Sequence, residues 1–271
     1  MGPYKKFRLP KDIPLDEYPK PEIYLDEARY LTDEAQKQGL ILRVMGPIAI
    51  HYYFPDYIDL YRRMERLGER IFTDIDYASY SKSRGKMVAF FNKHEYELEK
   101  RAAMLSGGER HIFFGGAIPM IDIFYDRLNY NHPIDYRGRL EIHPYCVSLT
   151  DLLLQKLQIV QINDKDIKDG MLLLLAAPLG EVDKNTININ YIAKLLSEDW
   201  GFFYTSTTNL VKIINSLDSV VALTGDHRSI IRGKVDELLR YIEKAPKSGR
   251  WKSREKTGIK KIWYNEVTDW G

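Results

Sequence analysis

The sequence predicts an α+β fold, in which a mixed β-sheet flanked by helices is followed by a mostly helical C-terminal half. Its 271 residues are 44% hydrophobic and 29% charged, enough to bury one large core or two modest ones. Up to about residue 147, apolar runs with helical spacing alternate with short apolar or alternating runs typical of strands. From residue 148 to 245 almost every apolar run has helical spacing.

Composition excludes several classes of protein. The 40 Lys and Arg residues against 38 Asp and Glu leave a net charge of +2, which argues against a broadly basic nucleic-acid coat. A single cysteine, Cys146, excludes an intramolecular disulfide and a zinc-cysteine cluster. No apolar run reaches the roughly 18 residues of a membrane helix, and the first residues carry charge where a signal peptide is apolar. We therefore expect a cytoplasmic protein without membrane contact.

The N-terminal elements are predicted from prolines, glycines and spacing. Residues 1–22 are rich in proline and charge and form an arm without a helix or central strand. Apolar residues at helical spacing predict a helix over 22–39, ended by Gly39. A strand over 40–45 follows, and a helix starts at Pro47, because proline is favoured at the first helical position.

The middle of the chain supplies the rest of the sheet. A helix over 58–67, ended by Gly68, precedes a strand over 70–80. Two helical patterns lie within 86–105. Three short runs separated by Gly, Pro and Asn then predict neighbouring strands over 111–116, 118–125 and 137–145.

The C-terminal half reads as a series of helices. Helical spacing covers residues 148–160, 166–177, 187–200, 208–217 and 229–245. We expect four parts: an arm (1–22), an α/β core (23–147), a helical domain (148–245) and a basic tail (246–271). The tail has tryptophans among its charges, which suits nucleic-acid binding, a solvated terminus, or a terminal strand over 259–267.

Two aspartates in FTDIDYASY are the first candidates for chemistry. On a strand, Asp74 and Asp76 project from the same face, since side chains alternate along a strand. Paired carboxylates repel one another and need a counter-charge, and hard oxygen ligands suit Mg²⁺. A D-x-D triplet alone is unspecific, because it arises by chance in a chain of this length.

A third acid strengthens this hypothesis. Asp122 is the one charged residue of the apolar run IPMIDIFY, and a carboxylate in a central strand requires a partner. Three carboxylates from two strands, holding Mg²⁺ around a triphosphate, can promote in-line nucleotidyl transfer. The alternative is an edge strand that turns this residue to water.

Two further features of the sequence suggest a nucleotide-binding site. VMGPIAIHYY predicts a strand, a glycine turn at Gly46 and a helix start, where backbone amides can face an anion. Lys156 is the only cation of the mostly apolar helical segment 148–160, from which its ammonium could reach phosphates. Its alternative is a surface lysine whose stem covers apolar neighbours.

The order of these pieces resembles the polymerase-β-like nucleotidyltransferase superfamily. They are the strand and Gly46 turn, TDID after a helix, the isolated acid in PMIDIF, and SLTDLLLQKL followed by KDIKD, within about 39–176. The chain is most similar to the minimal nucleotidyltransferases and to the toxins of abortive-infection toxin–antitoxin systems. This resemblance implies a nucleotidyltransferase-like sheet.

The resemblance also implies roles for particular residues. Asp74 and Asp76 would bind Mg²⁺, while Asp122 would complete the metal site and act as base toward the acceptor hydroxyl. The nucleotide-binding positions would be Gly46, Pro47, Thr73 and Lys156. Asp166 and Asp169 of KDIKD would support the helix pair, structurally or at the site. The family's second small residue is Pro47 here, which removes an amide donor from the triphosphate cradle.

Two functions follow as expectations. The first is a Mg²⁺-dependent enzyme that moves a nucleoside monophosphate from an NTP such as ATP to a hydroxyl on an RNA end, a protein or a small molecule. The second is a catalytically silent module that binds a nucleotide, a nucleic acid or a partner such as an antitoxin. Retention of all three acids favours the enzyme, and Pro47 favours the silent module.

Overall fold

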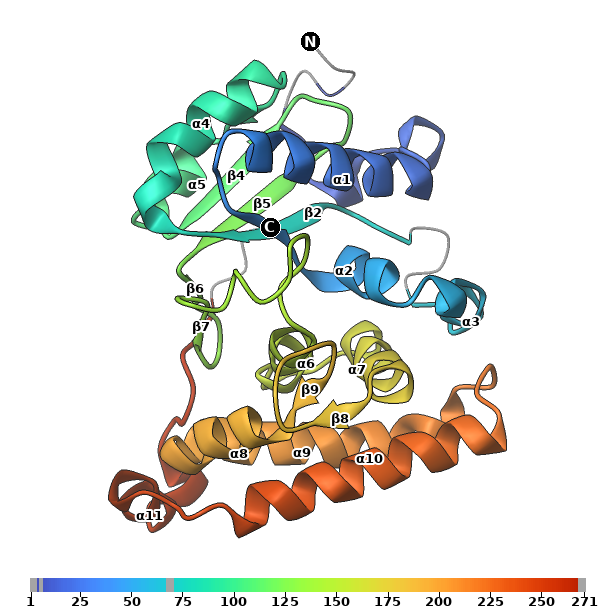
Figure 1. The fold of residues 1–271 in the computed structure, drawn as a ribbon, viewed down its shortest axis with the longest axis vertical. Coiled ribbons are helices and arrows are strands. Elements are labelled where there is room, and N and C mark those ends of the chain that lie inside the picture. The colour runs from blue at the N-terminus through green and yellow to red at the C-terminus, as the bar shows by residue number, and fades with distance from the viewer. Residues whose placement is uncertain (1–3, 5–6, 67–70, 268–271) are drawn as a thin grey trace.

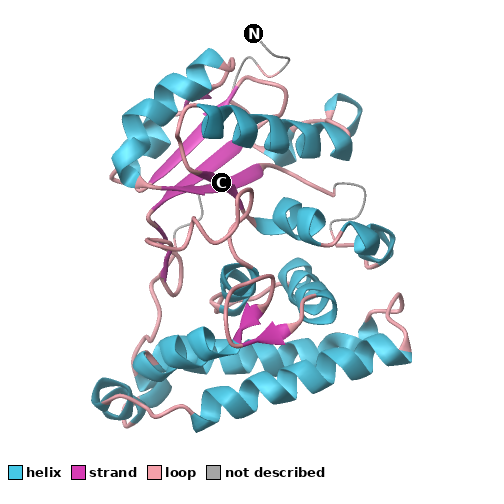
Figure 2. Ribbon diagram, in the orientation of Figure 1, coloured by secondary structure: helices cyan, strands magenta, loops and turns pink. Residues whose placement is uncertain are grey.

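The structure, a computed structural model, describes residue 4 and residues 7–66 and 71–267. Figure 1 shows an upper half, in which helices flank a sheet, and a lower half made mainly of helices. Figure 2 shows that all the longer strands lie in the upper half. The expected order of a mixed α and β half followed by a helical half is confirmed.

The main sheet has five strands in the order β1-β2-β5-β4-β3. Their bounds are β1 Leu42–Val44, β2 Ile75–Ser79, β3 Glu97–Leu98, β4 Arg110–Phe114 and β5 Ile121–Tyr125. Neighbours β2 and β5 run parallel, and the other neighbouring pairs are antiparallel, so the sheet is mixed as expected. Because β5 lies at the centre, the alternative that Asp122 marks an edge strand is wrong.

Helices of the upper half form where the apolar spacing predicts them. Helix α1 (Pro21–Lys37) buries Tyr24, Ala28 and Leu31, and Gly39 follows it with a φ of +67° that a residue with a side chain adopts with difficulty. Two short 3₁₀ turns, Pro10–Asp12 and Leu15–Glu17, precede it in the arm.

The remaining helices of this half are short. They are α2 (Gly46–Tyr53), α3 (Ile58–Arg63), α4 (Arg84–Lys93) and α5 (Lys100–Leu105). Helix α2 begins at Gly46, one residue before the predicted start, which leaves Pro47 within the first turn where its missing N–H costs nothing. The predicted end at Gly68 lies outside the described residues; α3 itself ends at Arg63.

One predicted strand is wrong. Residues 137–145 form turns and bends, although their side chains alternate. Arg139 is the reason: it is turned into the protein, where Asp151 and Asp183 bind its guanidinium. A small hairpin of β6 (Arg127–Leu128) and β7 (Ile134–Asp135) precedes this segment instead.

The lower half contains helices at the predicted places, except that the helix predicted to start at residue 208 starts at Trp200. They are α6 (Leu149–Leu157), α7 (Asp164–Ala176), α8 (Ile189–Glu198), α9 (Trp200–Ser216) and α10 (Gly225–Lys244). A short parallel pair, β8 (Leu179–Gly180) and β9 (Ile187–Asn188), joins α7 to α8 and was not predicted. Among the described residues, no helix has both the length and the hydrophobicity needed to cross a bilayer.

The two halves meet through α2, which packs against α6 and α7. One cluster of buried side chains runs through this junction and includes Ile48, Leu152 and Leu173, all at most 1% exposed. Helix α2 therefore lies between the sheet and the start of the helical half (Figure 1).

The predicted terminal strand over 259–267 does not form. The tail instead contains helix α11 (Gly249–Glu255) and a 3₁₀ turn, Gly258–Lys260, and then an extended segment that rises toward the sheet (Figure 1). Asn265 and Asn131 tie this segment to the loop after β6, since the Asn265 N–H donates to the Asn131 carbonyl at 2.9 Å.

Candidate active site

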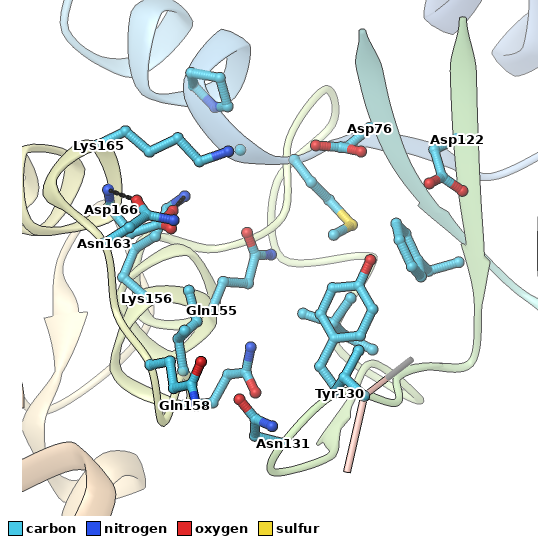
Figure 3. Close-up of a pocket in the computed structure, with 18 of the residues that line it drawn as sticks. Asp76, Asp122, Tyr130, Asn131, Gln155, Lys156, Gln158, Asn163, Lys165 and Asp166 are labelled. Carbon is cyan, nitrogen blue, oxygen red and sulfur yellow. Dashed lines mark hydrogen bonds and ion pairs between the residues drawn. The ribbon is translucent and has the colours of Figure 1, made fainter. Parts of the chain in front are cut away.

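Neighbouring parallel strands place two carboxylates side by side. Asp76 on β2 and Asp122 on β5 are register partners, so their side chains leave the same face of the sheet. Ile75 and Tyr77, which flank Asp76, are fully buried on the opposite face. Figure 3 shows both carboxylates directed into one pocket. The predicted adjacency of these two acids is therefore present in the fold.

The third acid reaches the pocket from a loop. Asp74 precedes β2, which begins at Ile75, so the expectation that both aspartates of TDID lie on one strand is wrong. Local hydrogen bonds hold this residue: the Thr73 hydroxyl donates to the Asp74 carboxylate at 2.9 Å. The hydroxyls of Tyr18 and Tyr24 donate to the Thr73 carbonyl, at 3.2 and 3.3 Å.

These side chains open onto a cavity of about 700 Å³ between the sheet and the helices. Its size is that of a ligand pocket. It is lined by all seven residues predicted for the site: Gly46, Pro47, Thr73, Asp74, Asp76, Asp122 and Lys156. The fold thus brings the predicted set together, while the role of each member stays a prediction.

The carboxylates are short of positive charge. Burial raises the pKa of Asp76 well above its usual range, and the like charges of Asp74 and Asp122 raise it further. Burial also raises the pKa of Asp74, with partial relief from Thr73 and Lys165. A raised pKa of this kind is expected where a carboxylate is removed from water or lies beside other carboxylates. A bound divalent cation would remove the imbalance.

Arg110 supplies the cation that an acid in a central strand requires. It comes from β4, and its Nε lies 2.9 and 2.8 Å from the two carboxylate oxygens of Asp122. Its Nη2 also donates to Asp122, and its guanidinium lies 5.3 Å from the ring centre of Phe124. Burial still raises the pKa of Asp122, although Arg110 opposes this effect.

The three acids have the right ligand atoms for Mg²⁺, but they do not form a complete coordination site. Carboxylate oxygens are the ligands that Mg²⁺ prefers. Among the described residues, no group of three or more His, Cys, Asp or Glu side chains is arranged to hold an ion. Asp122 is engaged with Arg110, so it must exchange part of that contact to complete a site with Asp74 and Asp76.

Gly46 faces these acids directly. Its φ of +61° is a left-handed conformation, and a Cβ at this position would lie 3.2 Å from the Asp76 carboxylate. Both conditions favour glycine, and they bring the backbone of the turn close to the Asp76 carboxylate. Pro47 follows within the same turn and contributes no N–H.

Lys156 lines the cavity, but two carboxylates hold its ammonium. Its Nζ lies 2.8 Å from Asp166 and 2.8 Å from Asp169, both from α7. Asp169 is also bound by Arg66, at 2.6 Å, and by the Tyr61 hydroxyl. Burial disfavours the charge of Lys156, but Asp169 and Asp166 outweigh this and raise its pKa above the usual range. The expected support of the helix pair by the two aspartates is consistent with these contacts.

Several lining residues were not predicted. Arg110, Tyr130 and Lys165 all border the cavity, and Figure 3 shows the Tyr130 hydroxyl directed toward Asp76 and Asp122. An arginine at the start of the apolar run RHIFF was the only sequence signal for Arg110. The pairing of β4 with β5, which makes it Asp122's partner, depends on the fold.

The basic tail contributes to the site in an unexpected way. Tyr264 and Glu266 line the cavity. The tryptophans expected to stack on nucleic acid pack against the helical half instead: Trp251 is 5% exposed beside Phe203, and the Trp263 Nε1 donates to the Thr205 hydroxyl at 3.0 Å. The interpretation of Trp251 as an open stacking surface is wrong.

Comparison with known proteins identifies no family. The chain matches no model of a protein family and no curated protein sequence. Among solved structures, it is similar to the antibiotic-resistance factor ANT(2'')-Ia, with 14% identity and a TM-score of 0.37 over 65% of this chain and 94% of that one. A likeness at this level assigns neither fold family nor function.

Proposed function

We propose that the chain is a Mg²⁺-dependent nucleotidyltransferase, which moves a nucleoside monophosphate from an NTP to an acceptor hydroxyl. One observation carries this proposal: Asp76 and Asp122 are register partners on parallel strands, and Asp74 joins them at the same cavity. Three neighbouring acids with raised pKa values are unfavourable without a cation, and their presence at one cavity supports a metal-dependent site.

The residues divide into three roles. Asp74 and Asp76 would hold Mg²⁺, which supplies charge neutralisation for the phosphates. The turn at Gly46 borders the same cavity as Asp76 and would contact the triphosphate there. Asp122 would accept the proton of the acceptor hydroxyl while that oxygen bonds to the α-phosphorus and pyrophosphate leaves. Asp122 would first have to give up part of its contact with Arg110, which holds both of its carboxylate oxygens.

The acceptor is open among an RNA end, a protein and a small hydroxylated molecule. The residues that border the cavity from the helical half and tail, including Gln158, Asn163 and Tyr264, would choose between them. RNA binding by the tail remains a proposal that rests on exposed basic residues such as Arg250 and Lys252, since its tryptophans are engaged.

The proposed activity is tested by label transfer. The purified chain is incubated with each α-labelled NTP, cell extract and either Mg²⁺ or EDTA, and the labelled molecule is identified. We expect transfer that needs Mg²⁺, is abolished by Asp76→Asn and is retained by Asp218→Asn, whose side chain is 78% exposed on the helical half. Equal labelling by the two variants would refute the proposal.

A catalytically silent nucleotide-binding or nucleic-acid-binding module, as one member of a toxin–antitoxin pair, is the second candidate. Two observations favour it: Pro47 removes an amide from the turn, and Arg110 occupies the carboxylate of Asp122. NTP binding that depends on Mg²⁺ and is lost in Asp74→Asn, without transfer to any acceptor, would support this candidate over the enzyme.

A further inference from the structure

In the part of the chain that the structure describes, four cationic side chains border the cavity, and three of them are paired with carboxylates. Arg66 binds Asp169, and Arg110 binds Asp122. Lys156 binds both Asp166 and Asp169. The fourth cation is Lys165. Within residues 7–66 and 71–267, no hydrogen bond or ion pair joins its ammonium to another side chain.

The pairing of the neighbouring carboxylates explains why neither of them binds the ammonium of Lys165. It is the second residue of α7, whose first turn reads Asp164, Lys165, Asp166. Asp164 pairs with Lys168 one turn later, at 2.6 Å, and Asp166 pairs with Lys156. Both neighbouring carboxylates are therefore engaged elsewhere, and the charge of Lys165 stays available to a ligand.

Lys165 also points the right way. Figure 3 shows its side chain extended across the pocket from α7, with its nitrogen directed toward the side where Asp76 lies. An NTP whose α-phosphorus lay near the three acids would carry its outer phosphates between the Gly46 turn and this ammonium.

We propose that Lys165, rather than Lys156, binds the β- and γ-phosphates of the NTP, and that Lys156 is a structural ion that joins α6 to α7. This inference rests on the nucleotidyltransferase function proposed above. An ammonium is a compact charge with three donors, which suits phosphate oxygens. For Lys156 to serve the same purpose it would have to leave the buried Asp166 without its counter-charge and Asp169 with Arg66 alone, which is unfavourable.

The proposal predicts how affinity depends on the number of phosphates. Calorimetric titration with Mg²⁺ and ATP, ADP, AMP or inorganic pyrophosphate would compare wild type with Lys165→Ala. We expect the variant to lose tenfold or more in affinity for ATP and pyrophosphate and to bind AMP within twofold of wild type. Lys165→Arg should retain most of the affinity, because it keeps a cation at this place.

A matched control lies on the same helix. Lys168 is held by Asp164 and does not border the cavity, so Lys168→Ala should leave all four affinities unchanged. Lys156→Met should lower the midpoint of thermal unfolding, while the folded fraction keeps the stronger binding of ATP than of AMP. A selective loss of ATP and pyrophosphate affinity in folded Lys156→Met would overturn the assignment.

The two proposals fail differently. If wild type binds ATP in a manner that depends on Asp76, but Lys165→Ala binds it equally well, then Lys165 is not the phosphate ligand and the function stands. If wild type binds neither ATP nor pyrophosphate with Mg²⁺, the nucleotidyltransferase proposal itself is wrong, and the assignment of Lys165 is wrong with it.

Discussion

Asp76 should make the metal-free protein less stable as the pH rises. Burial and the two neighbouring acids raise the pKa of its carboxyl well above the ordinary 3.8. Above pH 3.8 the unfolded chain has released this proton while the folded chain keeps it. The folded state then binds more protons than the unfolded state, so the free energy of unfolding falls with rising pH until the pH passes the folded pKa.

The size of the effect follows from the linkage relation. One proton held only by the folded state changes the free energy of unfolding by about 1.4 kcal/mol per pH unit. Asp76→Asn has no carboxyl to titrate at this position. Its free energy of unfolding should therefore rise relative to that of wild type, by up to about 1.4 kcal/mol for each pH unit. Buried histidines such as His111 and His132, with pKa values lowered to about 4, give an opposite slope below pH 6.5, but they are common to both proteins and cancel.

The assay is urea unfolding at half-unit steps from pH 4.5 to 8.5, in EDTA and in Mg²⁺. Asp76→Asn should be more stable than wild type in EDTA, by a margin that widens with pH, and Asp218→Asn should follow wild type. Mg²⁺ should stabilise wild type at high pH, where the carboxylate is ionised, and leave Asp76→Asn unchanged. A margin that is constant with pH would refute the electrostatic reasoning, and equal Mg²⁺ stabilisation of both would refute the metal site.

Three further sets of substitutions test the roles given to residues of this site. Lys156→Met leaves Asp166 and Asp169 with less counter-charge and should lower the free energy of unfolding by about 3–5 kcal/mol in urea titration, whereas the exposed Lys37→Met should change it little. Gly46→Ala and Gly39→Ala should each lose about 1–2 kcal/mol from their left-handed φ, but Gly46→Ala alone should also abolish Mg²⁺–ATP binding, since its Cβ presses on Asp76. Pro47→Ala returns an amide to the turn and should tighten ATP binding about tenfold, or ~1.4 kcal/mol, by calorimetry; no change would show that the turn does not hold phosphates.

A site residue could be predicted where its own stretch of sequence was unusual, and could not be predicted where its role depended on contacts made in the fold. Asp122 could be predicted because a lone acid in an apolar strand is anomalous whatever surrounds it. Its partner could not, because Arg110 meets it only through the antiparallel pairing of β4 with β5. The same holds for Asp74: the D-x-D spacing suggested a shared face, but β2 starts one residue too late, and Tyr18 and Tyr24 from the arm and α1 position the loop.

The predictability of the fold had a similar limit. Helical periodicity located α1 and the helices of the lower half, because one buried face repeats along each of them. Alternation misled at 137–145, where the inward residue is Arg139, held by ion pairs with distant Asp151 and Asp183. The predicted strand of the tail failed for the same reason, since Trp263 bonds to Thr205, and Asn265 bonds to Asn131 and Tyr130 rather than to a strand edge.

Lys156 and Lys165 show most clearly how the ion pairs of the fold change an interpretation that is based on sequence motifs. In the sequence Lys156 stands out, because it is the only cation of an apolar helix, while Lys165 is one of several charges in NDKDIKD. A cation that stands alone among apolar residues, however, is the one that needs carboxylate partners from elsewhere in the fold, since a buried charge must be compensated. A lysine whose acidic neighbours are already paired keeps its charge free. The residue that the sequence makes conspicuous thus stabilises the fold, and the inconspicuous one is better placed to bind a phosphate.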